Sequence, residues 1–164
     1  MESPYIDLFL AIQARIQEQV PEIKYIDQNL GQYMNEEFRK QMLFPCILVD
    51  FPVTNFSALQ GNNQLGDATI MITLFHDIWN NTNNLTPTAV KEAGLNYLSI
   101  DQKVFMALQG WNPDFCTPLM RSQHKSQNSN DIGLVVRETQ FNTSFEDYSL
   151  GDNETVYKLS LKTK

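Results

Sequence analysis

The chain has 164 residues, of which 42% are hydrophobic and 19% charged, and its formal net charge is −7. This apolar fraction, with 10 Phe and 6 Tyr, excludes wholesale disorder and suffices for the core of a single domain over residues 1–164. The excess of acidic residues argues against tight nucleic-acid binding and against docking on anionic membranes. Two cysteines are too few for a disulfide framework, and the sequence shows neither a signal peptide nor a membrane span, so we expect reduced thiols in a cytoplasm-like compartment.

The first predicted element is a helix that begins at Pro4 and ends near Val20. Ser3 is suited to cap its N-terminus, and Pro21 cannot continue it. Apolar side chains recur along it with the helical period, which places them on one face: Tyr5, Leu8, Phe9, Ile12 and Ile16. The pattern predicts an amphipathic helix that covers a core.

Three strands are predicted next, and the last two of them form a hairpin. Residues 22–27 are β-branched and short, which indicates a strand, whereas residues 32–42 are weakly patterned and indicate a loop or a short helix. Residues 45–51 are almost continuously apolar and are followed by a proline, which favours a central strand buried on both faces. Residues 67–77 alternate, so we expect a hairpin with a long, flexible loop over residues 60–66.

A polar insertion and a second helix follow the hairpin. Residues 80–87 are rich in Asn and Thr, and we expect them to form a mobile surface loop. Helical spacing is strongest over residues 101–109, with Ser99 or Asp101 as the N-cap and Gly110 at the C-terminal end.

The last third is again predicted to consist of strands. A strand opens at residues 119–121, residues 123–131 have the polarity of a hairpin tip, and residues 132–145 alternate. Beyond a core of residues 4–147, the C-terminal extension 148–164 contains a further alternating stretch at 156–161, an added edge strand or an arm. The order α-β-β-β-α-β-β predicts an α+β fold with a mixed or antiparallel sheet of about four to five strands and two main helices on one face.

Few residues carry the pattern of a chemical site. The soft metal ligands Cys46, His76, Cys116 and His124 lack metal-binding spacing, so we predict no metal and no cofactor. Cys46 could form a nucleophilic pair with His76 beside Asp77, but its apolar surroundings favour a core cysteine. The carboxylates are dispersed at strand ends and in loops and are interpreted as solvated: Glu36, Glu37, Asp50, Asp67, Glu146 and Asp147.

Two arginines lie on predicted strands with polar neighbours. Arg121 and Arg137 could pair with acids across the sheet or reach across an interface. Isolated glycines exclude a phosphate-binding loop. A domain with a full core, few ionisable residues and long polar loops is typical of an assembly component, so we predict no catalytic residues and no enzymatic activity.

The ordered set of elements resembles the tail terminator, or tail-completion, proteins of long-tailed bacteriophages and prophages. The resemblance spans roughly residues 4–147 and rests on the helix that ends before Pro21 together with these segments in order: Glu22-Ile23, Tyr33, Phe44 to Phe51, Gly66-Asp67 leading into Ile70 to Leu74, Val104-Phe105, Leu119-Met120-Arg121 and Phe145-Glu146-Asp147. It implies a structural virion protein whose copies form a ring, typically a hexamer, on the head-proximal end of the tail tube. Such rings stop tube polymerisation and dock on the head connector.

The resemblance also implies partners and a location. The partners would be further copies of the chain, the major tail tube protein and the head–tail connector or neck protein, with DNA only passing through a negatively charged lumen. The protein would reside in the virion tail after assembly in the bacterial host cytoplasm. We expect the loop at 80–84 and the tip at 123–131 to contact the tube or line the opening.

Three alternatives remain open from the sequence. A head–tail stopper or neck protein also forms rings around DNA, and a component of a contractile injection system shares ancestry with tail proteins. A small-molecule-binding or enzymatic α+β domain would instead use an apolar pocket near Cys46 and His76.

Overall fold

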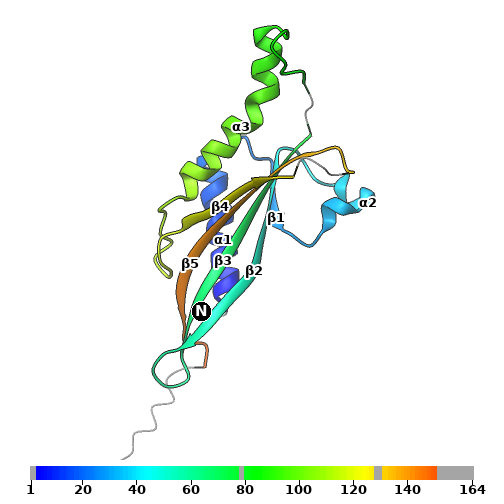
Figure 1. The fold of residues 1–164 in the computed structure, drawn as a ribbon. Coiled ribbons are helices and arrows are strands. Elements are labelled where there is room, and N and C mark those ends of the chain that lie inside the picture. The colour runs from blue at the N-terminus through cyan, green and yellow to red at the C-terminus, as the bar shows by residue number, and fades with distance from the viewer. Residues whose placement is uncertain (1–2, 78–79, 128–130, 151–164) are drawn as a thin grey trace, which may run out of the picture.

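A computed structural model describes residues 3–77, 80–127 and 131–150, and it confirms the α+β class (Figure 1). The strands form one mixed sheet: β1 (Tyr25–Gln28), β2 (Cys46–Ala58), β3 (Gln64–His76), β4 (Met120–Ser126) and β5 (Val135–Asp147). The helices are α1 (Pro4–Gln19), α2 (Glu36–Arg39) and α3 (Thr88–Leu108), with a 3₁₀ turn η1 (Gln32–Met34). The spatial strand order is β1-β2-β3-β5-β4.

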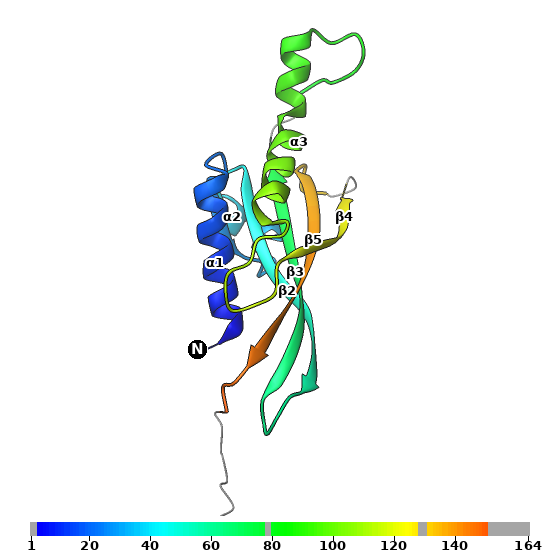
Figure 2. The same ribbon diagram turned by 90° about the vertical axis from the view of Figure 1, so that its left-hand side faces the viewer.

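The sheet separates two apolar clusters. The strand β1 runs parallel to β2, and every other pairing is antiparallel. On one face, α1 and the C-terminal half of α3 pack side by side and bury the larger cluster (Figures 1 and 2). On the other face, the connection between β1 and β2 covers a smaller cluster around Leu48 and Phe75. The strand predicted at residues 45–51 is therefore buried on both faces over residues 46–49, whereas Asp50 is exposed and Phe51 half-buried.

Helix α1 confirms the predicted bounds and the predicted apolar stripe. Leu8, Ile12 and Ile16 are fully buried against the sheet. Ser3 occupies the N-cap position, but the side-chain cap is not formed; its backbone carbonyl accepts the amides of Ile6 and Asp7 instead.

The hairpin departs from the prediction because β2 and β3 are longer. The strand β2 continues through Pro52 to Ala58, with a register shift between Asp50 and Val53. Pairing with β1 ends at Val49, so the missing amide of Pro52 leaves no broken bond on that side. The long loop predicted at residues 60–66 is therefore a short turn at 59–63.

The second helix is also longer than predicted. It begins at Thr88, so Ser99 and Asp101 lie inside the helix and neither caps it. Gly110, with φ of 71°, follows its C-terminal end as expected. Residues 80–87 form an exposed connection, as predicted; their predicted mobility stays a prediction.

The polar tip predicted at residues 123–131 is wrong in its first part. Residues 123–126 pair with β5 as the second half of β4. The alternating stretch at 156–161 lies outside the described residues. Within the described part of the chain, none of the helices combines the length and the apolar character that a membrane span requires.

Candidate assembly surfaces

The Cys46–His76 pair is the first candidate for chemistry, and the sheet separates the two side chains. Cys46 lies opposite Phe75, so the side chain of the next residue, His76, points to the other face. Cys46 is fully buried, and burial together with the negative charge of Asp77 raises the pKa of its thiol to about 12. A thiolate is needed for nucleophilic attack, so this geometry favours the core interpretation of Cys46.

The other two candidate metal ligands, Cys116 and His124, lie in different parts of the fold. Cys116 is buried where a single bridge joins it to Phe145, and burial raises the pKa of its thiol. His124 lies on β4. Among the described residues, no three His, Cys, Asp or Glu side chains form a group that could hold a metal ion.

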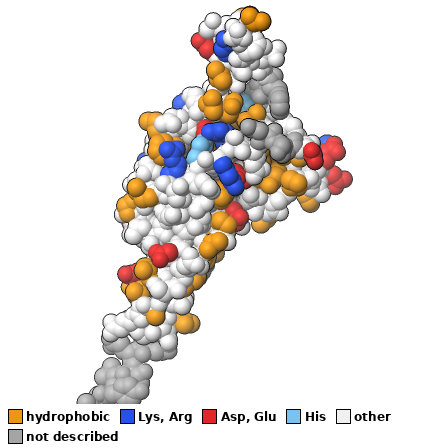
Figure 3. Space-filling view, in the orientation of Figure 1, with side chains coloured by type: hydrophobic (Ala, Val, Ile, Leu, Met, Phe, Trp, Pro, Cys, Tyr) orange, Lys and Arg blue, Asp and Glu red, His pale blue; other side chains and the backbone are white. Residues whose placement is uncertain are grey.

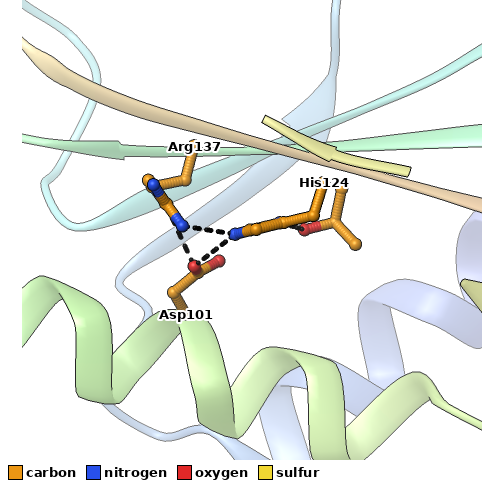
Figure 4. A network of polar contacts seen from close by, with 4 residues as sticks. Asp101, His124 and Arg137 are labelled. Atoms are coloured by element: carbon orange, nitrogen blue, oxygen red, sulfur yellow. Dashed lines mark hydrogen bonds and ion pairs between the residues drawn. The ribbon is translucent and has the colours of Figure 1, made fainter. Parts of the chain in front are cut away.

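A polar network joins α3 to the strands beneath it (Figure 4). Asp101 Oδ2 lies 3.0 Å from His124 Nε2 and 3.2 Å from Arg137 Nε. The other ring nitrogen of His124, Nδ1, lies 2.8 Å from the hydroxyl of Thr139. Asp101, one of the two candidate N-caps, instead ties the middle of α3 to β4 and β5.

The two arginines therefore differ from each other. Arg137 pairs with an acid, as expected, but the acid comes from α3 and not from a neighbouring strand. Arg121 places its guanidinium 3.7 Å from the ring centroid of Phe105, a cation–π contact. Among the described residues Arg121 forms no ion pair, which leaves its charge available to a partner.

The dispersed carboxylates serve local structure. Glu36 pairs with Lys40 one helical turn away, and Asp67 accepts the hydroxyl of Ser144 across the sheet. Hydrogen bonds from Ser149 lower the pKa of Asp147. The structure thus brings none of the carboxylates singled out in the sequence together as a catalytic pair within the described residues.

The connection between β1 and β2, residues 29–44, exposes the densest group of large apolar side chains. We call it the α2 knob. Its core-side residues cover the smaller cluster, while four others face outward with exposed fractions of 78, 67, 54 and 60%: Leu30, Met34, Phe38 and Leu43. Its helix α2 has four residues, capped by the side chain of Asn35, and is too short to bury a stripe of its own.

A hollow of about 400 Å³ lies between β1 and the α2 knob. Leu30 and Phe38 supply its apolar wall, and Asp27 supplies a carboxylate. The hydroxyl of Tyr25 donates to Asp27 Oδ2 at 2.6 Å, which raises the pKa of Tyr25 to about 12 and keeps it protonated. The described residues that line the hollow include no Lys or Arg, so Asp27 keeps its negative charge uncompensated.

The opposite edge of the sheet, β4, exposes positive charge beside apolar side chains. All seven residues of β4 are exposed, and Met120 stands out beside Arg121. Met106 of α3 is also largely exposed. Figure 3 shows Lys and Arg gathered over the β4 side and Asp and Glu at the tip of the α2 knob.

Helix α3 extends well beyond the sheet (Figures 1 and 2). Its first buried residue is Ile100, and apolar side chains before it stay exposed: Val90, Leu95 and Leu98. The described contacts of this half are with the connection before it, whose Thr82 and Asn80 pack tightly on Gly94, and between the Tyr97 and His76 rings. A helical segment of this length is marginal in water without packing, so it is a second candidate contact surface.

The apolar residues of the α2 knob had not been identified from the sequence. They occur within residues 29–44 without a helical or alternating period, and periodicity was the signal on which burial was predicted. Large apolar residues inside a polar, unpatterned segment are the signal that could have found them.

No family model matches the chain, and no curated protein matches it. Among solved structures, the chain is similar to a chain described as "Virion of native gene transfer agent (GTA) particle". The two are 12% identical, the similarity covers 87% of this chain and 91% of the other, and the TM-score is 0.40. The function is therefore argued from the surfaces of the chain itself.

Proposed function

We propose that the chain is a structural virion protein of the tail terminator kind. Its copies form a ring, a hexamer, that caps the head-proximal end of a tail tube, stops tube polymerisation and joins the tail to the head connector. The observation that carries the proposal is that opposite edges of one sheet expose two different surfaces, each with apolar side chains: the α2 knob and the β4 edge.

Two different surfaces on one subunit are what a ring requires. A two-fold dimer uses the same surface on both copies, whereas a closed ring joins one surface to another through a heterologous contact. Exposed side chains such as Leu30 and Met106 cost free energy in water, and covering them by a second copy removes that cost.

The remaining surfaces support contacts with other virion proteins. The projecting half of α3 and the connection at residues 80–87 lie at one extremity of the molecule (Figure 1), where they can reach the tail tube or the head connector. The net charge of −7 per subunit is compatible with a lumen that DNA traverses without binding. The residues at 80–84 are assigned to the tube contact or the opening.

The proposed role is not enzymatic. The buried, protonated thiol of Cys46 supports this assignment, because the strongest nucleophile candidate of the sequence lacks the thiolate that catalysis needs. The proposed location is the virion tail, with assembly in the cytoplasm of the bacterial host.

The test is whether the purified chain forms rings or caps. Light scattering coupled to size-exclusion chromatography gives the mass, and negative-stain imaging with purified tail tubes shows whether tube ends acquire a cap. Capped tubes of limited length are the expected result. Binding to purified heads but not to tubes would replace this role by that of a stopper or neck protein, and a monomer that binds neither would refute an assembly role.

A further inference from the structure

The two edges of the sheet differ in the sign of their uncompensated charge. At the β1 edge, the Asp27 carboxylate is oriented by the Tyr25 hydroxyl and by the backbone amide of Gln28, at 2.6 and 2.8 Å. Each oxygen accepts one of these bonds and retains a lone pair for a further donor. Asp27 forms no ion pair with any described residue.

At the β4 edge, the uncompensated charge is positive. Two other cations on this side have partners, because Lys125 pairs with Glu138 and Arg137 with Asp101. Arg121 is held over the Phe105 ring, and its backbone amide donates to the Gln109 side chain.

Apolar side chains accompany each charge. Leu30 and Phe38 form the wall of the hollow around Asp27. Met120 precedes Arg121 and is more than half exposed; its Sδ lies 3.6 Å from Nε2 of Gln109, the same side chain whose Oε1 accepts the Arg121 amide. Its flexible thioether side chain adapts to an irregular hollow. Each edge thus offers one charge beside exposed apolar surface, and the charges are opposite.

We infer that subunits join head to tail by placing the Met120-Arg121 corner of one copy in the hollow formed by Asp27, Leu30 and Phe38 of the next. The Arg121 guanidinium then pairs with the Asp27 carboxylate, and the Met120 side chain packs on Leu30. This inference rests on the proposed ring, and it specifies which surfaces the ring joins. The contact is heterologous, because neither surface is complementary to itself.

Disulfide capture tests this contact directly. Leu30→Cys and Met120→Cys are made as separate variants of the full chain, mixed under mild oxidation and analysed on a non-reducing gel. The native Cys46 and Cys116 are buried and do not compete for exposed thiols. Mixing is expected to give a covalent dimer containing one copy of each variant, because only this pairing brings the two new thiols together.

A chain carrying both substitutions is expected to give a ladder of covalent oligomers that ends at the ring size. A dimer formed by Leu30→Cys alone would overturn the inference, because it would reveal a two-fold contact. Rings or tube caps that form without the mixed disulfide would also overturn it, while leaving the proposed function intact. Tubes that stay uncapped would instead refute the proposed function.

A pair of charge-reversal substitutions tests the ion pair between Arg121 and Asp27. Arg121→Glu in the Met120→Cys chain is expected to lower the yield of the mixed dimer about tenfold, and Asp27→Lys in the Leu30→Cys chain is expected to restore it. Lys103→Glu, which makes the same change of charge at an exposed position of α3 that pairs with Glu22 and lies outside both proposed surfaces, is the control and leaves the yield unchanged. Equal yields for Arg121→Glu and this control would overturn the pairing of Arg121 with Asp27.

Discussion

Helix α1 and the α2 knob use the same kinds of side chain with opposite results. Leu8, Ile12 and Ile16 of α1 are fully buried, whereas Leu30 and Phe38 of the knob are more than half exposed. The difference is geometric. The α1 stripe repeats with the helical period over 16 residues and matches one face of the sheet, while the knob is a short crossover between parallel strands.

Burial on α1 stabilises the folded subunit, whereas under the proposed function the exposed apolar side chains of the knob serve association. Substitutions on α1 should therefore lower folding stability, and substitutions on the knob should affect assembly with little change in stability.

The largest effect on folding is expected for Ile12→Ala. Removing a fully buried side chain loses transfer free energy and leaves a cavity, so the free energy of unfolding should fall by about 2 to 5 kcal/mol. Urea denaturation followed by circular dichroism measures it. The control is Leu10→Ala on the exposed face of the same helix, where a change within about 0.5 kcal/mol is expected.

The next effect is expected at the network that ties α3 to the sheet. Asp101→Asn removes the carboxylate that pairs with Arg137 and His124, and all three side chains are mostly buried. The free energy of unfolding should therefore fall by about 1 to 3 kcal/mol. Glu36→Gln, which breaks the exposed pair with Lys40, should cost less than about 0.5 kcal/mol. Equal losses in the two variants would show that the network adds no more than a surface ion pair.

A smaller loss is expected for Gly66→Ala. A Cβ atom there would lie 2.9 Å from the Phe145 ring and 3.0 Å from the Phe56 ring. Because ring ends can turn slightly, we expect a cost of about 1 kcal/mol, at the low end for overpacking. Gly31→Asn is the control, since this position has open space and Asn tolerates its positive φ.

The pH dependence of stability should reflect His76. Burial lowers the pKa of His76 below its ordinary value of 6.5, so the unfolded chain binds a proton more readily than the folded chain. The contribution of this group is present above pH 6.5 and is lost as the pH falls below that value. His76→Gln should flatten the decline measured between pH 7 and 5, and an unchanged slope would assign the decline to other groups.

The smallest effect on folding is expected for Leu30→Ala and Phe38→Ala. Both side chains are more than half exposed, so the free energy of unfolding should change by less than about 0.5 kcal/mol. Ring or cap formation should nevertheless weaken and require a higher protein concentration, as measured by light scattering and negative-stain imaging. Full assembly by both variants would show that the knob is not an assembly surface.

Part of the proposed assembly surface could be anticipated from the sequence. Arg121 was identified as a residue that either pairs across the sheet or reaches across an interface, and the structure leaves its charge without an ionic partner among the described residues. Asp27 and Leu30 had no such signal. Their significance comes from a hollow that forms only when β1 and the α2 knob are placed side by side.

The sequence by itself determined the elements whose signals are local. Periodicity set the buried stripe of α1, because the spacing of apolar residues decides which side chains share a face. The apolar run at residues 45–51 set a central strand, of which residues 46–49 are buried on both faces. Tertiary structure alone decided the strand order, the passage of β2 through Pro52, the role of Asp101 and the exposure of the α2 knob. These depend on contacts between segments distant in the chain, and whether an apolar face is covered depends on what the rest of the fold places against it.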